Sequence, residues 1–207
     1  RGTNLFNYFE RGNIGQYLYS DYFNSLKELR EKYKDKIDLK FGFEMEYYPN
    51  IFEKMLADVK SFGAEYLILG EHFTVEEIPD SHEHSAAPND SVDKLKTYVN
   101  RIIEGTKTGV FTYIAHPDMI NFTGDLSIYK EEMRKICVCS REYNIPLELN
   151  CLGIRLFNNY NILLPLAVSL NFTPSIAAAP RLISIRPRNI SKYSYMVQIL
   201  SSTCRFK

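Results

Sequence analysis

Acidic residues are missing from the last part of this 207-residue sequence. All 25 Asp and Glu residues lie at or before Glu148, whereas seven Lys and Arg residues lie between Leu149 and Lys207. The formal net charge of zero therefore hides a basic end. A single globular domain rarely separates its charges in this way, so we expect the character of the chain to change near residue 155.

Other absences narrow the class of protein. No apolar run approaches the length that spans a bilayer, and the start, Arg1-Gly2-Thr3, has neither methionine nor an apolar signal core. The start without methionine indicates a fragment or a trimmed chain. The spacing of the four cysteines fits neither a disulfide framework nor a four-thiolate zinc site. These features favour a cytoplasmic protein with reduced thiols and no membrane partner. The cysteines are Cys137, Cys139, Cys151 and Cys204.

Helical and strand-like patterns alternate along the chain. Apolar residues at helical spacing predict four helices, the first of them with Asp21 as its N-cap. Alternating or continuous apolar residues predict four strands between and after these helices. This order favours an α/β fold with parallel strands joined by crossover helices. The predicted helices cover 22–35, 49–62, 92–103 and 127–143, and the predicted strands cover 37–44, 66–69, 110–115 and 146–149.

Polar side chains capable of binding a metal ion stand where the predicted strands end. Glu44 ends the first strand, His72 follows the second and His116 follows the third. The carboxyl ends of parallel strands gather on one face of a barrel, so one carboxylate and two imidazoles would meet there. That is a reasonable set of ligands for a divalent ion. Glu46 shares its side of the strand with Glu44 and could be the ligand instead, and each histidine taken alone could be purely structural.

Four blocks of sequence resemble, in the same order, blocks of the PHP (polymerase and histidinol phosphatase) family, and they are closest to its histidinol-phosphatases. The resemblance covers roughly residues 20 to 155. The blocks are Gly42-Phe43-Glu44-Met45-Glu46-Tyr47-Tyr48-Pro49, Leu69-Gly70-Glu71-His72-Phe73, Tyr113-Ile114-Ala115-His116-Pro117-Asp118, and Leu147-Glu148-Leu149-Asn150 with Gly153-Ile154-Arg155.

This resemblance implies a distorted seven-stranded (β/α) barrel of the PHP type, incomplete here at both ends. Residues 1–155 would form the phosphoesterase domain without its first strand. The family implies a metal-dependent phosphatase that converts L-histidinol phosphate to L-histidinol and phosphate in histidine biosynthesis. Its partner would be a small-molecule phosphate ester and not nucleic acid.

The resemblance also implies roles for individual residues. Glu44 matches a carboxylate that bridges two metal ions, and His72 and His116 match ligands of single ions. The ions would be zinc, manganese or iron, two or three in a complete site. His82 and His84, in the loop after the second strand, would contact the phosphate or imidazole of the substrate, or else would be solvated.

The sequence also departs from the family pattern. The family has a His-x-His motif on its first strand, but the first histidine here is His72. It has an Asp-x-His motif on its last strand, but no histidine follows His116. A reading-frame shift after Arg155 would explain the missing motif and the missing acids of residues 156–207. The alternatives are a PHP phosphoesterase of other specificity, including nuclease-type domains attached to DNA polymerases, a non-catalytic barrel fragment, and a basic tail for an anionic partner such as nucleic acid.

Overall fold

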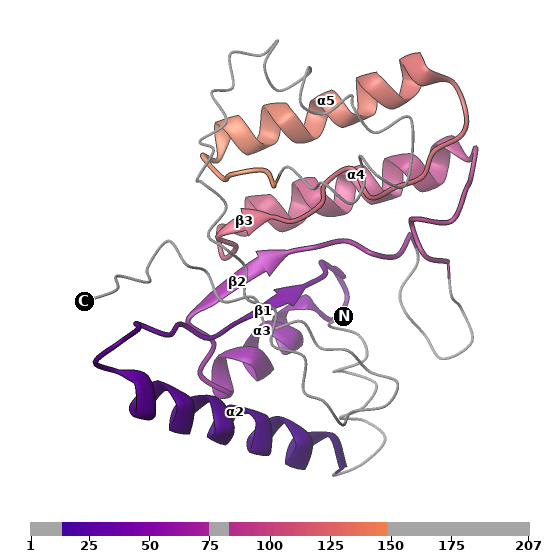
Figure 1. Cartoon of the computed structure of the whole chain (residues 1–207). Coiled ribbons are helices and arrows are strands. Elements are labelled where there is room, and N and C mark those ends of the chain that lie inside the picture. The colour runs from indigo at the N-terminus through magenta and orange to yellow at the C-terminus, as the bar shows by residue number, and fades with distance from the viewer. Residues whose placement is uncertain (1–13, 75–82, 149–207) are drawn as a thin grey trace. The chain divides into compact units, whose positions relative to one another are not determined.

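The computed structural model describes residues 14–74 and 83–148, with side chains from residue 23 onward. These residues form a mixed α/β structure in which three strands make one sheet in the order β1-β2-β3 (Figure 1). Strands β2 and β3 pair in parallel, with Ile68 opposite Tyr113, which confirms the parallel arrangement expected for these two strands. The elements are α2 (Ile14–Tyr33), β1 (Gly42–Met45), α3 (Phe52–Ser61), β2 (Tyr66–Leu69), α4 (Val92–Lys107), β3 (Tyr113–Ile114) and α5 (Leu126–Glu142).

The chain divides into two compact units. Of the described residues, one unit contains 14–44 and 51–67, and the other contains 45–50, 68–74 and 83–148. In the first unit, Phe23 of α2 is buried in a cluster with Leu39 and Phe41. The ring of Phe23 stacks on the ring of Phe62 at 5.6 Å. Aromatic stacking of this kind adds to the burial of apolar area that holds the unit together.

Two predictions for the first unit were wrong in detail. Helix α2 already begins at Ile14, so Asp21 lies inside the helix and is not its N-cap. Strand β1 covers only Gly42–Met45, although the predicted strand began at Ile37. Leu39 and Phe41 are nevertheless buried, because alternate residues of this extended segment point into one cluster. The alternation of apolar and polar residues therefore indicated which side chains are buried, but it did not show that the segment pairs with a neighbouring strand.

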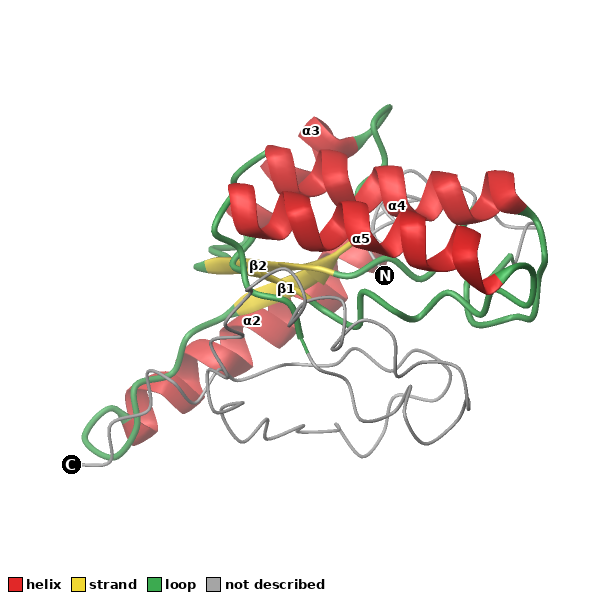
Figure 2. Ribbon diagram, turned by 90° about the horizontal axis from the view of Figure 1, so that it is seen from above, coloured by secondary structure: helices red, strands yellow, loops and turns green. Residues whose placement is uncertain are grey.

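The second unit is built on two packed helices. Helices α4 and α5 lie side by side in Figure 1 and again in Figure 2, which views the molecule from above. Each buries one stripe at helical spacing. Each also has a side-chain N-cap, because Ser91 accepts a hydrogen bond from the backbone N–H of Lys94 and Asp125 accepts one from that of Ser127. The buried stripes include Leu95, Tyr98, Val99 and Ile102 of α4, and Tyr129, Met133, Ile136 and Cys137 of α5.

The sheet is smaller than the sequence predicted. Strand β3 covers two residues where residues 110–115 were predicted, and Leu147 forms an isolated parallel bridge to Ile114 where a fourth strand was predicted. The residues described thus include three strands, and the seven-stranded barrel stays a prediction. The predicted boundary at Arg155 and the segment 156–207 lie outside the described residues.

Two of the four cysteines lie among the described residues. Cys137 and Cys139 are both buried and free. Burial raises the pKa of Cys137 to about 11, which keeps its thiol protonated at neutral pH. Within the described residues, none of the helices is long and apolar enough to cross a bilayer.

Candidate metal centre

The ends of β2 and β3 bring two histidine side chains together. His72 lies three residues beyond Leu69, the last residue of β2, and His116 lies two residues beyond Ile114, the last residue of β3. The backbone N–H of Ala115 donates to the carbonyl of Leu69 at 2.8 Å, which holds the two strand ends together. The imidazole centroids of His72 and His116 are 4.7 Å apart, with the rings inclined at 64°.

The backbone at His116 is held in an uncommon conformation. Its φ is +32°, in the region that non-glycine residues seldom occupy and that costs on the order of 1–3 kcal/mol. Two contacts stabilise it. The N–H of His116 donates to Oε2 of Glu148 at 2.8 Å, and the hydroxyl of Tyr98 donates to its carbonyl at 3.3 Å. The side chain of His116 is therefore presented from a strained and well-supported backbone, as is common in functional sites.

Two fully buried glutamates lie beside His72. Oε1 of Glu46 is 3.2 Å from Nδ1 of His72, and the hydroxyl of Tyr48 donates to Oε2 of Glu46. Oε1 of Glu71 accepts a hydrogen bond from the backbone N–H of Tyr47 at 2.6 Å. Burying a carboxylate costs free energy unless it is paired or protonated. Two of them in one place therefore mark a region where the charge must be balanced.

The two glutamates divide the charge unequally. Burial raises the pKa of Glu71 well above its ordinary value, and the negative charge of Glu46 raises it further. Burial acts in the same direction on Glu46, yet the pKa of Glu46 is lowered, and the contact with His72 is the largest of the effects that lower it. Burial and the charge of Glu46 also raise the pKa of Tyr48, which stays a neutral donor. The negative charge is thus concentrated on Glu46, next to His72.

Glu44 completes the set of ligands predicted from the sequence. Glu44, His72 and His116 each offer one ligand atom, and these atoms lie within 4.8 Å of one another. A carboxylate with two imidazoles suits zinc, and three protein ligands leave open positions as in catalytic sites. Among the described residues, Oε1 of Glu46 and Oε2 of Glu71 are buried without a hydrogen-bond partner, so this region holds polar atoms that a cation could satisfy. The residues fit a divalent cation, and their roles as its ligands stay predictions.

Of the two loop histidines, the structure describes only His84. The ring of His84 lies 6.1 Å from that of His72, and its Nδ1 accepts a hydrogen bond from the backbone N–H of Ala86 at 3.0 Å. In the neutral ring the proton therefore sits on Nε2, which makes His84 a hydrogen-bond donor and a poor metal ligand. His82 lies outside the described residues.

Several contributors to this centre were missed by sequence reasoning. Glu71 was read only as part of a block, although a charged residue directly after a buried strand was a signal for it. Glu148 was placed on the fourth strand without a role, and in the structure it holds the backbone of His116. Glu46, the alternative ligand, has its Oε1 at 3.2 Å from Nδ1 of His72.

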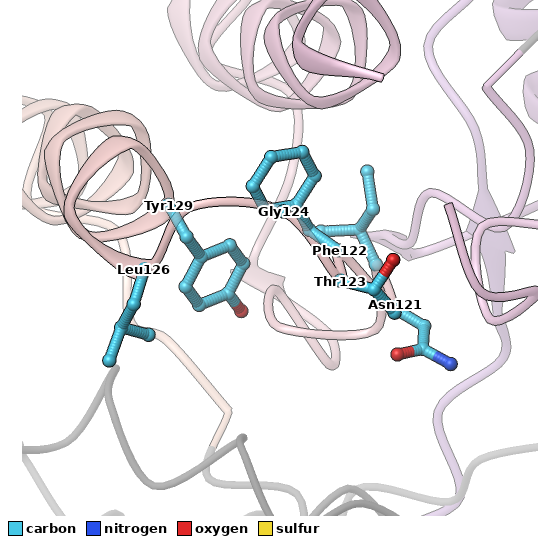
Figure 3. Close-up of a pocket in the computed structure, with 7 residues that line it drawn as sticks. Asn121, Phe122, Thr123, Gly124, Leu126 and Tyr129 are labelled. Carbon is cyan, nitrogen blue, oxygen red and sulfur yellow. The ribbon is translucent and has the colours of Figure 1, made fainter. Parts of the chain in front are cut away.

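A separate cavity of about 190 Å³ lies at the start of α5 (Figure 3). The rings of Phe122 and Tyr129 stack at 6.3 Å in its wall, and Leu126 at its edge is 49% exposed. No candidate ligand lines this cavity. Its lining residues are Ile120, Asn121, Phe122, Thr123, Gly124, Leu126 and Tyr129.

Comparison with solved structures finds similarity to the histidinol phosphate phosphatase from Lactococcus lactis subsp. lactis Il1403, in complex with zinc, L-histidinol and phosphate. The two chains are 19% identical, the TM-score is 0.48, and the match covers 67% of this chain and 54% of that one. This chain therefore spans about half the length of that enzyme. No family model matches the chain, and no curated protein matches it.

Proposed function

We propose that this chain belongs to a metal-dependent phosphatase that hydrolyses L-histidinol phosphate to L-histidinol and phosphate. The observation that carries the metal-dependent part is the approach of ligand atoms from Glu44, His72 and His116 to within 4.8 Å of one another. The choice of substrate is supported by the sequence blocks, which resemble those of histidinol-phosphatases.

The residues of the centre would have different roles in the reaction. Glu44, His72 and His116 would hold the cation. A bound divalent cation supplies positive charge for the phosphate oxygens and lowers the pKa of a water molecule. His84, with its proton on Nε2, is a suitable donor to a phosphate oxygen. Arg101 donates to the carbonyl of Phe73 at 3.1 Å and so fixes the segment that follows His72.

Phosphate release from L-histidinol phosphate tests this proposal. We expect release by the metal-stripped chain to begin when zinc or manganese is added and to stop with EDTA. His116→Ala should lower it by about 100-fold or more, since losing even an outer partner of a metal ligand costs about 10–100-fold. Glu131→Gln, on an exposed position of α5, serves as the matched control and should leave the rate unchanged. Release that needs no metal, or that survives His116→Ala, would contradict the proposal.

A second comparison separates the ligand from the loop residue. Glu44→Gln should lower phosphate release more than His82→Ala, because it removes a negative charge from the cation while changing the shape of the side chain little. The measurement is the initial rate at saturating manganese for both variants. Equal losses would show that Glu44 has no special relation to the metal. Faster turnover of a nucleotide or short DNA than of L-histidinol phosphate would instead favour a phosphoesterase of other specificity.

A further inference from the structure

The contact between Glu46 and His72 involves a particular nitrogen atom. Oε1 of Glu46 lies 3.2 Å from Nδ1 of His72. Glu46 is completely buried and its other oxygen is occupied by the hydroxyl of Tyr48. The carboxylate is therefore held from behind and presented to one nitrogen of the imidazole.

This contact bears on the tautomer of His72. The negative charge of a carboxylate 3.2 Å from Nδ1 favours the proton on that nitrogen, which leaves the lone pair on Nε2. Histidines that bind metal ions commonly have a carboxylate at their other ring nitrogen, which fixes the ring and makes the ligating nitrogen more basic. Glu46 can take that role, because Oε1 lies at Nδ1 of His72 and Oε2 is held by the hydroxyl of Tyr48.

We propose that Glu46, held by Tyr48, is a positioning residue that orients His72 so that Nε2 faces the metal ion. The inference rests on the metal centre of the proposed function and assigns within it a role to a residue outside the ligand set. Glu46 does not touch the substrate, so its effect passes through His72.

The amide variant Glu46→Gln tests this role, since it removes the charge beside Nδ1 of His72 while preserving the size of the side chain. Tyr48→Phe tests it from the other side, because it removes only the hydroxyl that donates to Oε2 of Glu46.

Cobalt binding to the full 207-residue chain provides the test, followed by visible absorption. We expect Glu46→Gln to raise the cobalt Kd by about 10–100-fold. Tyr48→Phe should raise it by a smaller factor, and the exposed control Glu131→Gln should leave it unchanged. A two-bond proton–nitrogen NMR correlation of the zinc-loaded wild-type chain should show His72 protonated at Nδ1.

The outcomes separate the two proposals. A wild-type chain that binds no cobalt overturns the metal centre and the positioning role with it. Cobalt binding by the wild-type chain with an unchanged Kd for Glu46→Gln overturns the positioning role alone, as does a zinc ion found on Nδ1. Should Glu46→Gln fail to fold by circular dichroism, Tyr48→Phe decides in its place, since it removes a single hydroxyl group. An unchanged Kd for that variant then overturns the proposal.

Discussion

Glu65 joins three parts of the first unit through one carboxylate. Its Oε2 accepts the backbone N–H of Phe41 at 3.0 Å and pairs with the guanidinium of Arg30, which also lies 3.7 Å over the ring of Phe41. Lys40 approaches the other oxygen at 3.6 Å. A charged acceptor of a backbone N–H, backed by a guanidinium, is among the stronger polar contacts of a protein surface.

The pH dependence of stability follows from this carboxylate. Partial burial acts to raise the pKa of Glu65, but the Phe41 N–H and Arg30 outweigh it and hold the pKa below its ordinary 4.5. A depressed pKa means that the stabilisation is present above pH 4.5 and is lost as pH falls through the lower, folded-state value. The side chain is 31% exposed, so we expect Glu65→Gln to cost less than about 1 kcal/mol at pH 7.

Thermal melts at several pH values check this prediction. The melting temperature of Glu65→Gln should be about 2–4 °C or less below that of the wild-type chain at pH 7. The difference should shrink below pH 4.5 and disappear once both states bind the proton. The exposed Glu53→Gln, on α3, is the control for loss of a carboxylate in the same unit. A deficit that stays constant from pH 7 to pH 3 would show that the charge of Glu65 is not its cause.

For individual residues, the sequence predicts the candidate ligands better than it predicts the residues that hold those ligands in place. His72 and His116 could be found because a strand end is a local feature of the sequence, and parallel strands bring such ends together. The partner of a buried carboxylate is not a local feature. The contact of Glu46 with His72 and that of Glu148 with the backbone of His116 join residues far apart in sequence. They depend on registers and loop paths that periodicity does not determine.

Helix α4 is the element whose beginning the sequence marks most clearly. Ser91 is its N-cap, and its side chain accepts a hydrogen bond from the N–H of Lys94 at 3.3 Å. We expect Ser91→Ala to lower the free energy of unfolding by about 1 kcal/mol, because one N–H of the first turn loses its acceptor. Urea unfolding should show a lower midpoint with an unchanged slope. Ser91→Asp, which can still cap, should retain most of the stability; equal losses from both variants would contradict a capping role.

The beginnings of the other helices show why element boundaries are harder to predict. Asp21 has the chemistry of an N-cap, yet α2 starts at Ile14 because helical structure continues on its N-terminal side. Helix α3 has Ile51 at its N-cap position, without any side-chain cap, so no capping residue announces it. Its end was predictable, since Gly63 takes a φ of +88° that favours glycine. A residue with the chemistry of an N-cap therefore does not by itself determine where a helix begins.

Ligand counting sets the limit for the whole molecule. Among the described residues, three side chains bring ligand atoms within 4.8 Å of one another, a set that suits a single ion with open positions, whereas two or three ions would need more ligands. This sequence has four histidines in all and no acid after Glu148. We therefore expect the 207-residue chain to bind one ion and to hydrolyse L-histidinol phosphate more slowly than a histidinol-phosphatase that carries the His-x-His and Asp-x-His motifs.

Equilibrium dialysis with elemental quantification measures that stoichiometry directly, and a thermal melt measures its consequence. Zinc at about 100 times its Kd should stabilise the folded chain by about 2.7 kcal/mol, because it binds the folded state in preference to the unfolded one. EDTA should reverse the shift, and His116→Ala should abolish it. Two or three ions per wild-type chain would show that further ligands come from outside the described residues, such as His82. Full activity from a one-ion chain would instead show that a bridged pair of ions is not needed for the hydrolysis.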